Sequence, residues 1–596
     1  MNWLLILMVA VVVASSPGVD EVIRNYTFNL THSFVNPDGK YKSGFLINGM
    51  APGPTIEGDE NDWIQVTVNN HLPVAITMHF HGIMQRGTPW ADGVPGITQN
   101  PIPPEDCFTY LFQLKDQYGF AWYHAHHRGY STDGLYGAMN IKPKIGRDRP
   151  YRKITNNTRE LEIIKRAEES PLTLIADDSF KWNMDVVMAR MFDYGIDPLC
   201  SQSILINGRG RVVCHGNEIF NRLSAKKSSS YRPTFDSMGC MRAENGYDNA
   251  TDYFGLEVPG YSPPCTPTFT DPYKMESNSS WIYLNVLNGG GQYTKAFSID
   301  GHSMYVISVD GIFVDPIETH ILMLPVGSRI TVVVKAKMGV FPMRFTLTKS
   351  PQYSEGVAYW HSKPESKEGT NCDYEGSPYQ GCQENGGFSI IPTKYQDLDG
   401  SPLGEYNFSW PIDTKPFEKN AKYNLGMRQA DHTFDLYLNR TGMITFSMFK
   451  DGTLLPKMNM KTPLLQSLNE TFGNWALRDD IHYNDTVDII LNNNNMMGHP
   501  IHLHGHLFYV IGFSGSENFY HSNLKEAIEN DYKVKENPPL VDVVYVPPGG
   551  HAVIRFVADN PGLWILHCHN LGHLIGGMGA VLFEAEDKIP SQIFSV

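Results

Sequence analysis

The chain has 596 residues, which is too many for one hydrophobic core, and domains of about 150 residues would give three or four of them. Its formal net charge of -15 excludes nucleic acid and anionic lipid as expected partners, because an acidic surface repels both. The 53 Gly and 39 Pro interrupt the chain often, which favours short strands and turns over long helices.

The N-terminal segment, residues 1–16, has the pattern of a secretory signal peptide. Its apolar run from Trp3 to Ala14 is shorter than the roughly 20 residues that a membrane-spanning helix needs. The alternative is an uncleaved anchor, since no Lys or Arg precedes the run. The sequence shows no second run of this kind, so we expect a secreted, extracellular protein without a membrane anchor.

Asparagines in Asn-x-Ser/Thr triplets fit a secreted protein and predict a glycoprotein, because a modified asparagine must lie on the surface. The acceptors are Asn25, Asn29, Asn156, Asn249, Asn278, Asn407, Asn439, Asn469 and Asn484.

Most of the eight cysteines should pair in the oxidising compartment that secretion implies. Cys568 is set aside because it lies in a motif of candidate metal ligands. Pairing of neighbours along the chain predicts the disulfides Cys200–Cys214, Cys240–Cys265 and Cys372–Cys382, and leaves Cys107 unpaired.

Strands are predicted wherever apolar and β-branched residues alternate with polar ones. The clearest runs in the first two thirds of the chain are residues 63–68, 281–286 and 329–334. Asp310-Gly311 lies between two β-like runs and predicts a hairpin turn.

The last third again contains sequence typical of β-strands, at residues 543–546 and 553–557. Residues 523–530 are a rare stretch with helical periodicity. Residues 351–386 are polar and predict a long surface excursion. This pattern predicts an all-β protein built from three sandwich-like domains. Their expected limits are 21–146, 150–398 and 399–596.

Four short histidine motifs carry the chemistry. Side chains at positions i and i+2 of a strand share one face, so each His-x-His pair can present two imidazoles to one metal site. Four such pairs beside apolar sequence typical of strands are difficult to explain by packing alone. The motifs are His79-Phe80-His81, His124-Ala125-His126, His499-Pro500-Ile501-His502-Leu503-His504 and His567-Cys568-His569.

The last motif indicates copper. On a strand, Cys568 points away from the face that its two histidine neighbours share, and therefore serves a different metal centre. His573 and Met578 follow five and ten residues later, and His499 can come from another strand. A thiolate, two imidazoles and a weak axial Met make a blue-copper site, whereas structural zinc sites prefer paired cysteines.

Eight further histidines suit three coppers that keep open positions for oxygen, which brings the expected cofactors to four copper ions. The backbone of the tripeptide at Cys568 then links the two centres as a route for electrons. The eight are His79, His81, His124, His126, His502, His504, His567 and His569.

These segments resemble those of the multicopper oxidases, the family of laccases, ascorbate oxidases and ferroxidases, and the resemblance covers most of the chain. It implies three cupredoxin-like β-sandwich domains, with type 1 copper in the third and a trinuclear cluster between the first and third. The matching segments are HFHGIMQRGTPWADGVPGITQ, WYHAHHRGYSTDGLYGAM, FSIDGHSMYVISVDG, HPIHLHGHLFYVIG and WILHCHNLGHLIGGM.

The resemblance also implies a role for each ligand. Asp92 matches an acidic residue that supplies protons to the cluster, or else forms a simple Asp-Gly turn. With His573 and Cys568 it completes the expected catalytic set. The implied ligands are His499, Cys568, His573 and axial Met578 for type 1 copper, His79 and His502 for type 2, and His81, His124, His126, His504, His567 and His569 for the type 3 pair.

The expected reaction is laccase-like: one-electron oxidation of phenols or similar small reducing substrates at type 1 copper, coupled to four-electron reduction of O2 to water. Ascorbate oxidase and ferroxidase activity are alternatives with the same copper sites, and a non-catalytic copper-binding protein of the cell surface is an alternative of another class.

The sequence departs from the family pattern in two places. The family often has Cys where Asn100 stands, and Asn570-Leu571-Gly572 differs from the residues usual at these positions. Substrate preference is therefore not carried over. A monomer or dimer is expected.

Overall fold

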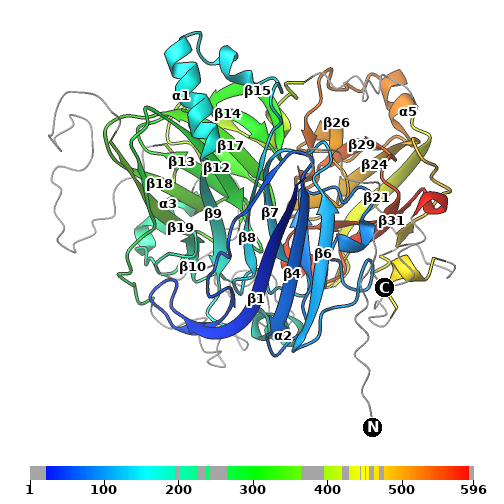
Figure 1. Ribbon diagram of the computed structural model, residues 1–596, viewed down its shortest axis with the longest axis horizontal. Helices are drawn as coiled ribbons and strands as arrows, with labels where there is room; N and C mark the ends of the chain where they lie inside the picture. Colours follow the sequence, from blue (N-terminus) through cyan, green and yellow to red (C-terminus); the bar gives the residue numbers. More distant parts are fainter. Residues whose placement is uncertain are drawn as a thin grey trace.

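The computed structural model describes residues 22–194, 200–225, 235, 237–240, 265–350, 352–363, 395–418, 429–442, 444–449, 452–455, 462–468 and 475–589. Six β-sheets are formed within these ranges, and they pair into three cupredoxin-like sandwiches. Figure 1 shows the first sandwich in blue, the second mainly in green and the third in orange and red. The all-β prediction is confirmed. The expected signal peptide lies outside the described residues.

The first sandwich consists of two four-stranded sheets whose buried side chains include Phe28, Val66 and Phe80. One sheet has the order β2 (Lys42–Ile47), β1 (Ile23–Val35), β4 (Trp63–His71), β6 (Asp106–Gln113). The other has the order β3 (Ile56–Asp59), β8 (Tyr136–Lys142), β7 (Gly119–Ala125), β5 (Met78–His81). Every second residue of β4 is buried, as its alternating sequence predicts.

The second sandwich has two six-stranded sheets. The first has the order β10 (Ser203–Ile206), β9 (Leu172–Ser179), β12 (Trp281–Asn288), β17 (Arg329–Lys335), β14 (Met304–Val309), β15 (Ile312–Thr319). The second has the order β11 (Lys274–Ser277), β19 (Glu355–Ser362), β18 (Gly339–Leu347), β13 (Lys295–Ile299), β16 (Ile321–Leu324), β20 (Phe408–Ser409). Asp310 and Gly311, at φ 47° and 84°, form the predicted hairpin turn.

The surface excursion predicted over residues 351–386 is wrong in its first part. Residues 355–362 are strand β19, which pairs with β18 over its whole length, and Ala358 and Trp360 are fully buried in the core. The polar composition of the rest of the segment hid this strand. Residues 364–386 lie outside the described ranges.

The third sandwich carries the later histidine motifs. One sheet has the order β22 (Phe446–Ser447), β21 (His432–Arg440), β24 (Thr486–Asn493), β29 (His551–Val557), β26 (Phe508–Ser514), β27 (Leu540–Val541). The other has the order β23 (Ala476–Leu477), β31 (Gly579–Glu584), β30 (Gly562–Cys568), β25 (His499–Leu503), β28 (Val543–Val546). Strands β28 and β29 contain the two runs that the sequence predicts.

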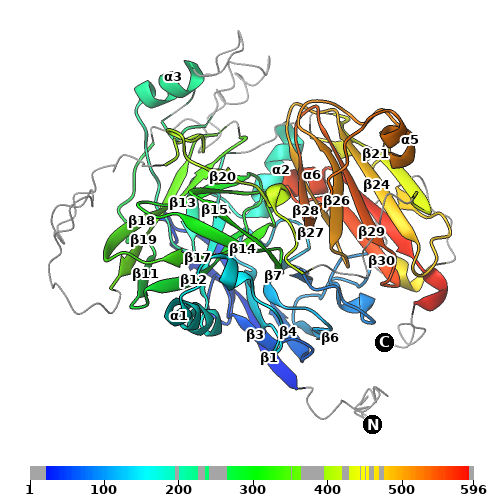
Figure 2. The same cartoon turned by 90° about the horizontal axis from the view of Figure 1, so that it is seen from above.

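Helices occupy the connections between strands. The described helices are α1 (Thr158–Glu169), α2 (Met184–Tyr194), α3 (Asn217–Ala225), α5 (Leu524–Glu529) and α6 (Leu571–Ile575). Only α5 is predicted from the sequence. Helix α2 packs Met184 and Met188 against Leu571 of α6, and Figure 2 shows these two helices side by side between the second and third sandwiches.

Two of the three predicted disulfides, Cys200–Cys214 and Cys240–Cys265, are wrong. Cys200 pairs with Cys240 and Cys214 pairs with Cys265, each with a Cα–Cα distance of 5.8 Å. The reason is a contact that the spacing of cysteines does not show. The side chain of Gln352 accepts a hydrogen bond from the Ser201 amide at 3.0 Å, and its backbone forms a bridge with Cys240.

Two further cysteine predictions have different outcomes. Cys107 is free, as expected, and it is also exposed. Cys372 and Cys382 lie outside the described residues, so their predicted pairing remains a prediction.

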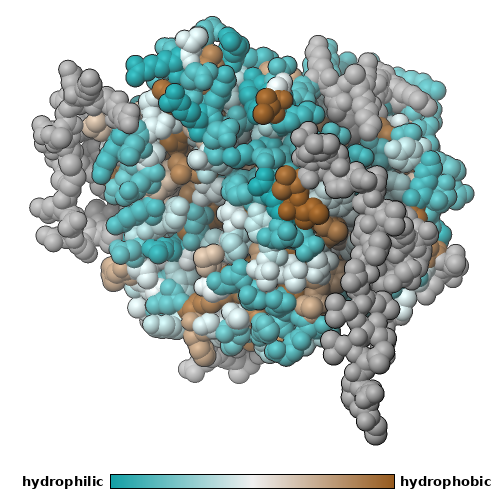
Figure 3. Space-filling view, viewed as in Figure 1, coloured by the Kyte–Doolittle hydropathy of each residue, from teal (hydrophilic) through white to brown (hydrophobic). Residues whose placement is uncertain are grey.

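The face of the molecule in Figure 3 is largely hydrophilic with small scattered hydrophobic patches, as the negative net charge leads one to expect. Among the helices of the described ranges, none combines the length and the apolar character needed to cross a bilayer. Glycosylation remains a prediction. Acceptors with exposed side chains are Asn25, Asn29, Asn156, Asn278, Asn407 and Asn484.

A histidine at the start of β21 should make the stability of the third sandwich depend on pH. Burial lowers the pKa of His432, but its hydrogen bonds to Asp479 and Asp485, at 3.2 and 3.0 Å, outweigh burial and raise it. Burial raises the pKa of Asp485, but hydrogen bonds from the His482 amide and from His432 lower it. The pair therefore stabilises the fold most between the unfolded pKa values of roughly 4 and 6.5.

Replacing His432 by Gln should thus lower the melting temperature at pH 5.5 by on the order of 2 °C. The wild-type protein loses this stabilisation as the pH rises through the raised pKa of His432, so the two curves should coincide at pH 9. Calorimetry at both pH values measures this. An equal loss at pH 5.5 and pH 9 would show that His432 acts by packing and not by charge.

Candidate metal centre

Strand pairing brings the four histidine motifs together from two sandwiches. In the first, β5 pairs with β7 so that His79 lies opposite His124. In the third, β25 pairs with β30 so that His502 lies opposite His567 and Ile501 lies opposite Cys568. The two sheets face each other, and their histidines meet at the interface between the sandwiches.

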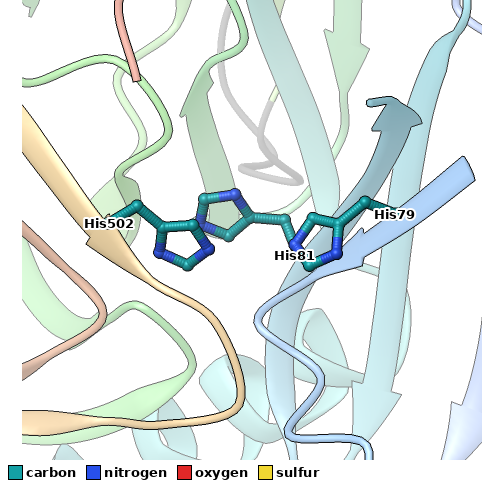
Figure 4. Close-up of side chains that lie close together, drawn as sticks. All are labelled: His79, His81 and His502. Atoms are coloured by element: carbon teal, nitrogen blue, oxygen red, sulfur yellow. The ribbon is translucent and has the colours of Figure 1, made fainter. Parts of the chain in front are cut away.

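The eight histidines form three groups, in each of which one ligand atom per residue lies within 4.8 Å of the others. All eight are buried. Figure 4 shows the first group, with His502 from β25 facing His79 and His81 from β5, and the rings of His81 and His502 stack at 3.8 Å. The groups are His79, His81 and His502; His81, His124 and His569; and His126, His504 and His567.

Backbone carbonyls fix which ring nitrogen of several histidines faces inward. Nδ1 of His79 donates to the Asp92 carbonyl at 2.7 Å, and Nδ1 of His502 donates to the Asp542 carbonyl at 2.7 Å. Nδ1 of His124 donates to the Ala125 carbonyl at 3.0 Å. The Nε2 atoms of these three histidines are buried without a hydrogen-bond partner. A buried nitrogen with a free lone pair is costly in a packed core but is what a metal ligand requires, so these residues fit bound metal.

Burial also sets the protonation state of the cluster. It lowers the pKa of most of these histidines well below the usual value, and neighbouring imidazoles lower it further; the pKa of His567 falls to about 4. Neutral imidazole is the form that binds metal, so the cluster is ready to bind cations without first losing protons. The pKa is lowered well below the usual value for His81, His124, His126, His502, His504 and His569.

A second centre is formed by one thiol and two histidines. The Cys568 Sγ lies 3.6 Å from Nδ1 of His499 and 3.4 Å from Nδ1 of His573, and the two nitrogens are 3.0 Å apart. Met578 is fully buried, its carbonyl accepts from the Cys568 amide at 3.1 Å, and its amide donates to the His573 carbonyl at 2.9 Å. The chain thus curls back after α6 and brings all four predicted residues to one place.

The tripeptide at the end of β30 joins the two centres. His567 belongs to the group with His126 and His504, and His569 belongs to the group with His81. Cys568 between them faces the second centre, as alternation along a strand requires. One covalent segment of three residues therefore contributes to both centres.

Asp92 is both a turn residue and a neighbour of the cluster. Its fully buried carboxylate lies 2.9 Å from Nδ1 of His504 and 3.2 Å from Nδ1 of His79. Gly93 follows at φ +81°, where an added Cβ would lie 1.8 Å from the Met78 carbonyl oxygen. The Asp-Gly turn is thus needed to place the carboxylate between two histidines.

Asp542 is a site residue that the sequence does not predict. Its carbonyl holds His502, and its carboxylate Oδ1 lies 3.4 Å from Nε2 of His81. The sequence feature that could indicate this residue is a single carboxylate within the apolar run Leu540-Val541-Asp542-Val543-Val544. A small cavity of about 10 Å³, which is room for roughly one water, is lined by His79, His502 and Asp542 among others.

Family profiles and curated relatives agree on one family for this chain. Profiles described as multicopper oxidase match residues 29–145, 172–362 and 453–588. The chain is 30% identical to a laccase of Pestalotiopsis fici over 96% of this chain and 93% of that protein, and 28% identical to the laccase abr2 of Aspergillus fumigatus over 97% of each.

Solved structures show the same fold. The crystal structure of Fet3p, described as a multicopper oxidase that functions in iron import, superposes with a TM-score of 0.67 at 22% identity, covering 96% of this chain and 93% of that one. The laccase from Botrytis aclada gives a TM-score of 0.66 at 22% identity, covering 96% and 91%.

Proposed function

Since the chain belongs to the multicopper oxidase family, we propose that it is a secreted, laccase-like enzyme that oxidises phenols or similar small reducing substrates and reduces O2 to water. The observation that carries the proposal is the convergence of eight buried histidines beside a Cys568–His499–His573 centre. Bound copper would accept single electrons from the reducing substrate and deliver four of them to dioxygen.

The donor chemistry supports copper at both centres. A thiolate with two imidazoles suits a blue-copper site, to which Met578 would add the axial thioether, and open clusters of neutral imidazoles suit copper that also binds oxygen. The proposed ligands are His499, Cys568, His573 and Met578 for type 1 copper, His79 and His502 for type 2, and His81, His124, His126, His504, His567 and His569 for the type 3 pair.

The surroundings of His573 support an organic, aromatic reductant. The Phe446 ring lies 4.2 Å from the His573 ring, and α6, which carries His573, packs against the apolar side chains of α2. This apolar, aromatic packing around His573 favours an electron-rich phenol over Fe(II), which would need carboxylates there. Asp92 is proposed to supply protons to the oxygen side, because it touches the two opposed motifs at His79 and His504.

Copper content and oxygen uptake test the proposal together. Protein purified from the culture medium should contain four copper ions per chain, should lose its blue colour when the copper is chelated, and should consume oxygen fastest with electron-rich phenols. The screen also includes ascorbate and Fe(II). A preference for either would replace the laccase-like proposal by ascorbate oxidase or ferroxidase activity. A chain holding one copper or none would be a non-catalytic binding protein.

The same preparation tests the proposed processing and organisation. Mass spectrometry should find the N-terminus after residue 16, and limited proteolysis should cut near the proposed domain limits of 146–150 and 398–399. Retention of residues 1–16 in the protein from the medium would contradict the signal peptide.

A further inference from the structure

The second sandwich holds none of the four histidine motifs, yet one of its side chains reaches the cluster. Arg329, at the start of β17, is buried, with its side chain 1% exposed. Its Nη1 and Nη2 donate to the two carboxylate oxygens of Asp542 at 2.7 and 2.6 Å. It also donates to the carbonyls of Gly327 and Phe120 at 3.2 and 3.4 Å. One guanidinium thus contacts all three sandwiches.

Asp542, in turn, contacts two histidines of the cluster. Its carbonyl accepts from His502 at 2.7 Å, which turns Nε2 of His502 inward. Its carboxylate faces Nε2 of His81 at 3.4 Å, which leaves Nδ1 of His81 directed to His569 at 3.3 Å. The two groups of Asp542 therefore orient one histidine from the third sandwich and one from the first.

The hairpin turn of the second sandwich fixes both members of the ion pair. The Asp310 carboxylate accepts from the Arg329 amide at 3.0 Å and from the Asp542 amide at 3.2 Å. The neighbouring loop forms a wall of the same site. A Cβ added to Gly327 would lie 2.7 Å from Cδ2 of His569 and 3.1 Å from Cε1 of His81.

From these contacts we infer that Arg329 is a positioning residue for the oxygen-side copper cluster, acting through Asp542 on His502 and His81. The inference rests on the proposed function, because it assigns the role of a residue around the proposed type 2 and type 3 sites. Without the guanidinium, the Asp542 carboxylate is a buried, unpaired charge, and the 540–542 segment must shift to reach water or another donor. That shift moves the carbonyl that holds His502.

The test compares two buried, doubly hydrogen-bonded Arg–Asp pairs with nearly the same distances. Arg329→Met removes the pair beside the cluster. Arg555→Met removes a matched pair, in which Nε and Nη2 of Arg555 bind Asp488 at 2.6 and 2.7 Å between β29 and β24. Copper per chain, the type 2 copper signal in electron paramagnetic resonance and the blue absorption are measured for each, with the melting temperature as a measure of general destabilisation.

For Arg329→Met we expect loss of the type 2 signal and of about one copper per chain, while the blue absorption per chain persists. Arg555→Met should keep the type 2 signal even if its melting temperature falls as far. Arg329→Lys keeps the positive charge but cannot make two parallel hydrogen bonds to the Asp542 carboxylate. It should release type 2 copper to a chelator at about 10- to 100-fold lower chelator concentration than the wild type. It serves as the second variant where Arg329→Met does not fold.

Three results would overturn the inference: a full type 2 signal in Arg329→Met, equal loss of that signal in Arg555→Met, or wild-type copper retention in Arg329→Lys. Failure of the proposed function looks different, because the wild-type protein itself would then lack the type 2 signal. The variants are therefore compared only after the wild-type protein has been shown to hold four coppers.

Discussion

Replacement of Cys568 by Ser is expected to remove the blue absorption and to reduce oxygen consumption with any phenol to the level of heat-treated protein. Cys568 is the one thiol of the second centre, with its Sγ at 3.6 and 3.4 Å from the nitrogens of His499 and His573. A serine hydroxyl is too hard a donor to replace thiolate at a blue-copper site. The change is nearly isosteric, so fold and trinuclear cluster should persist, with three coppers per chain by elemental analysis.

The chain provides a matched control for this experiment. Cys107 is free and exposed on β6, so Cys107→Ser should keep four coppers, the blue colour and full turnover. If the Cys568→Ser protein stayed blue and active, the assignment of the second centre would be wrong. If both variants lost activity alike, thiol chemistry unrelated to the centre would be the cause.

Local periodicity made the strands and the histidine pairs predictable. A His-x-His pair on a strand fixes two side chains on one face whatever the rest of the fold does. Strand β5 contains both histidines of its pair, and β7, β25 and β30 each end one residue before the second histidine of theirs. The opposite orientation of Cys568 follows from the same period. The domain limits and the copper roles remain predictions, since the positions of histidines in space do not identify the ion between them.

Contacts between distant segments were not predictable in the same way. Arg329 and Asp542 are 213 residues apart and lie in separate sandwiches, and neither has a spacing that indicates its partner. The two described disulfides were not predictable for the same reason, because Cys200 meets Cys240 through Gln352 and not through closeness along the chain. The sequence does not predict helix α1, because its two buried residues, Leu161 and Ile164, are a weak signal within a mostly polar segment.

Replacement of Asp92 by Asn should lower the turnover of oxygen by roughly 10²- to 10⁴-fold, the usual contribution of a positioned acid or base. The amide can still accept the hydrogen bond from Nδ1 of His504, now at 2.9 Å, so the turn and the histidines should keep their places. What is lost is a fully buried carboxylate between His79 and His504, the group that is proposed to supply protons to the oxygen side. Steady-state oxygen uptake measures the turnover.

A second measurement separates the oxygen side from the substrate side. Bleaching of the blue absorption by a phenol without oxygen depends on His573 and Cys568, so its rate in Asp92→Asn should equal that of the wild type. Asp38→Asn is the control, because Asp38 is equally buried but bonds to neutral groups such as Ser203, at 2.7 Å. Wild-type turnover in Asp92→Asn would leave this residue as a turn former only. Slower bleaching would show that it shapes the entry of electrons, and the fall in turnover would then not measure proton supply.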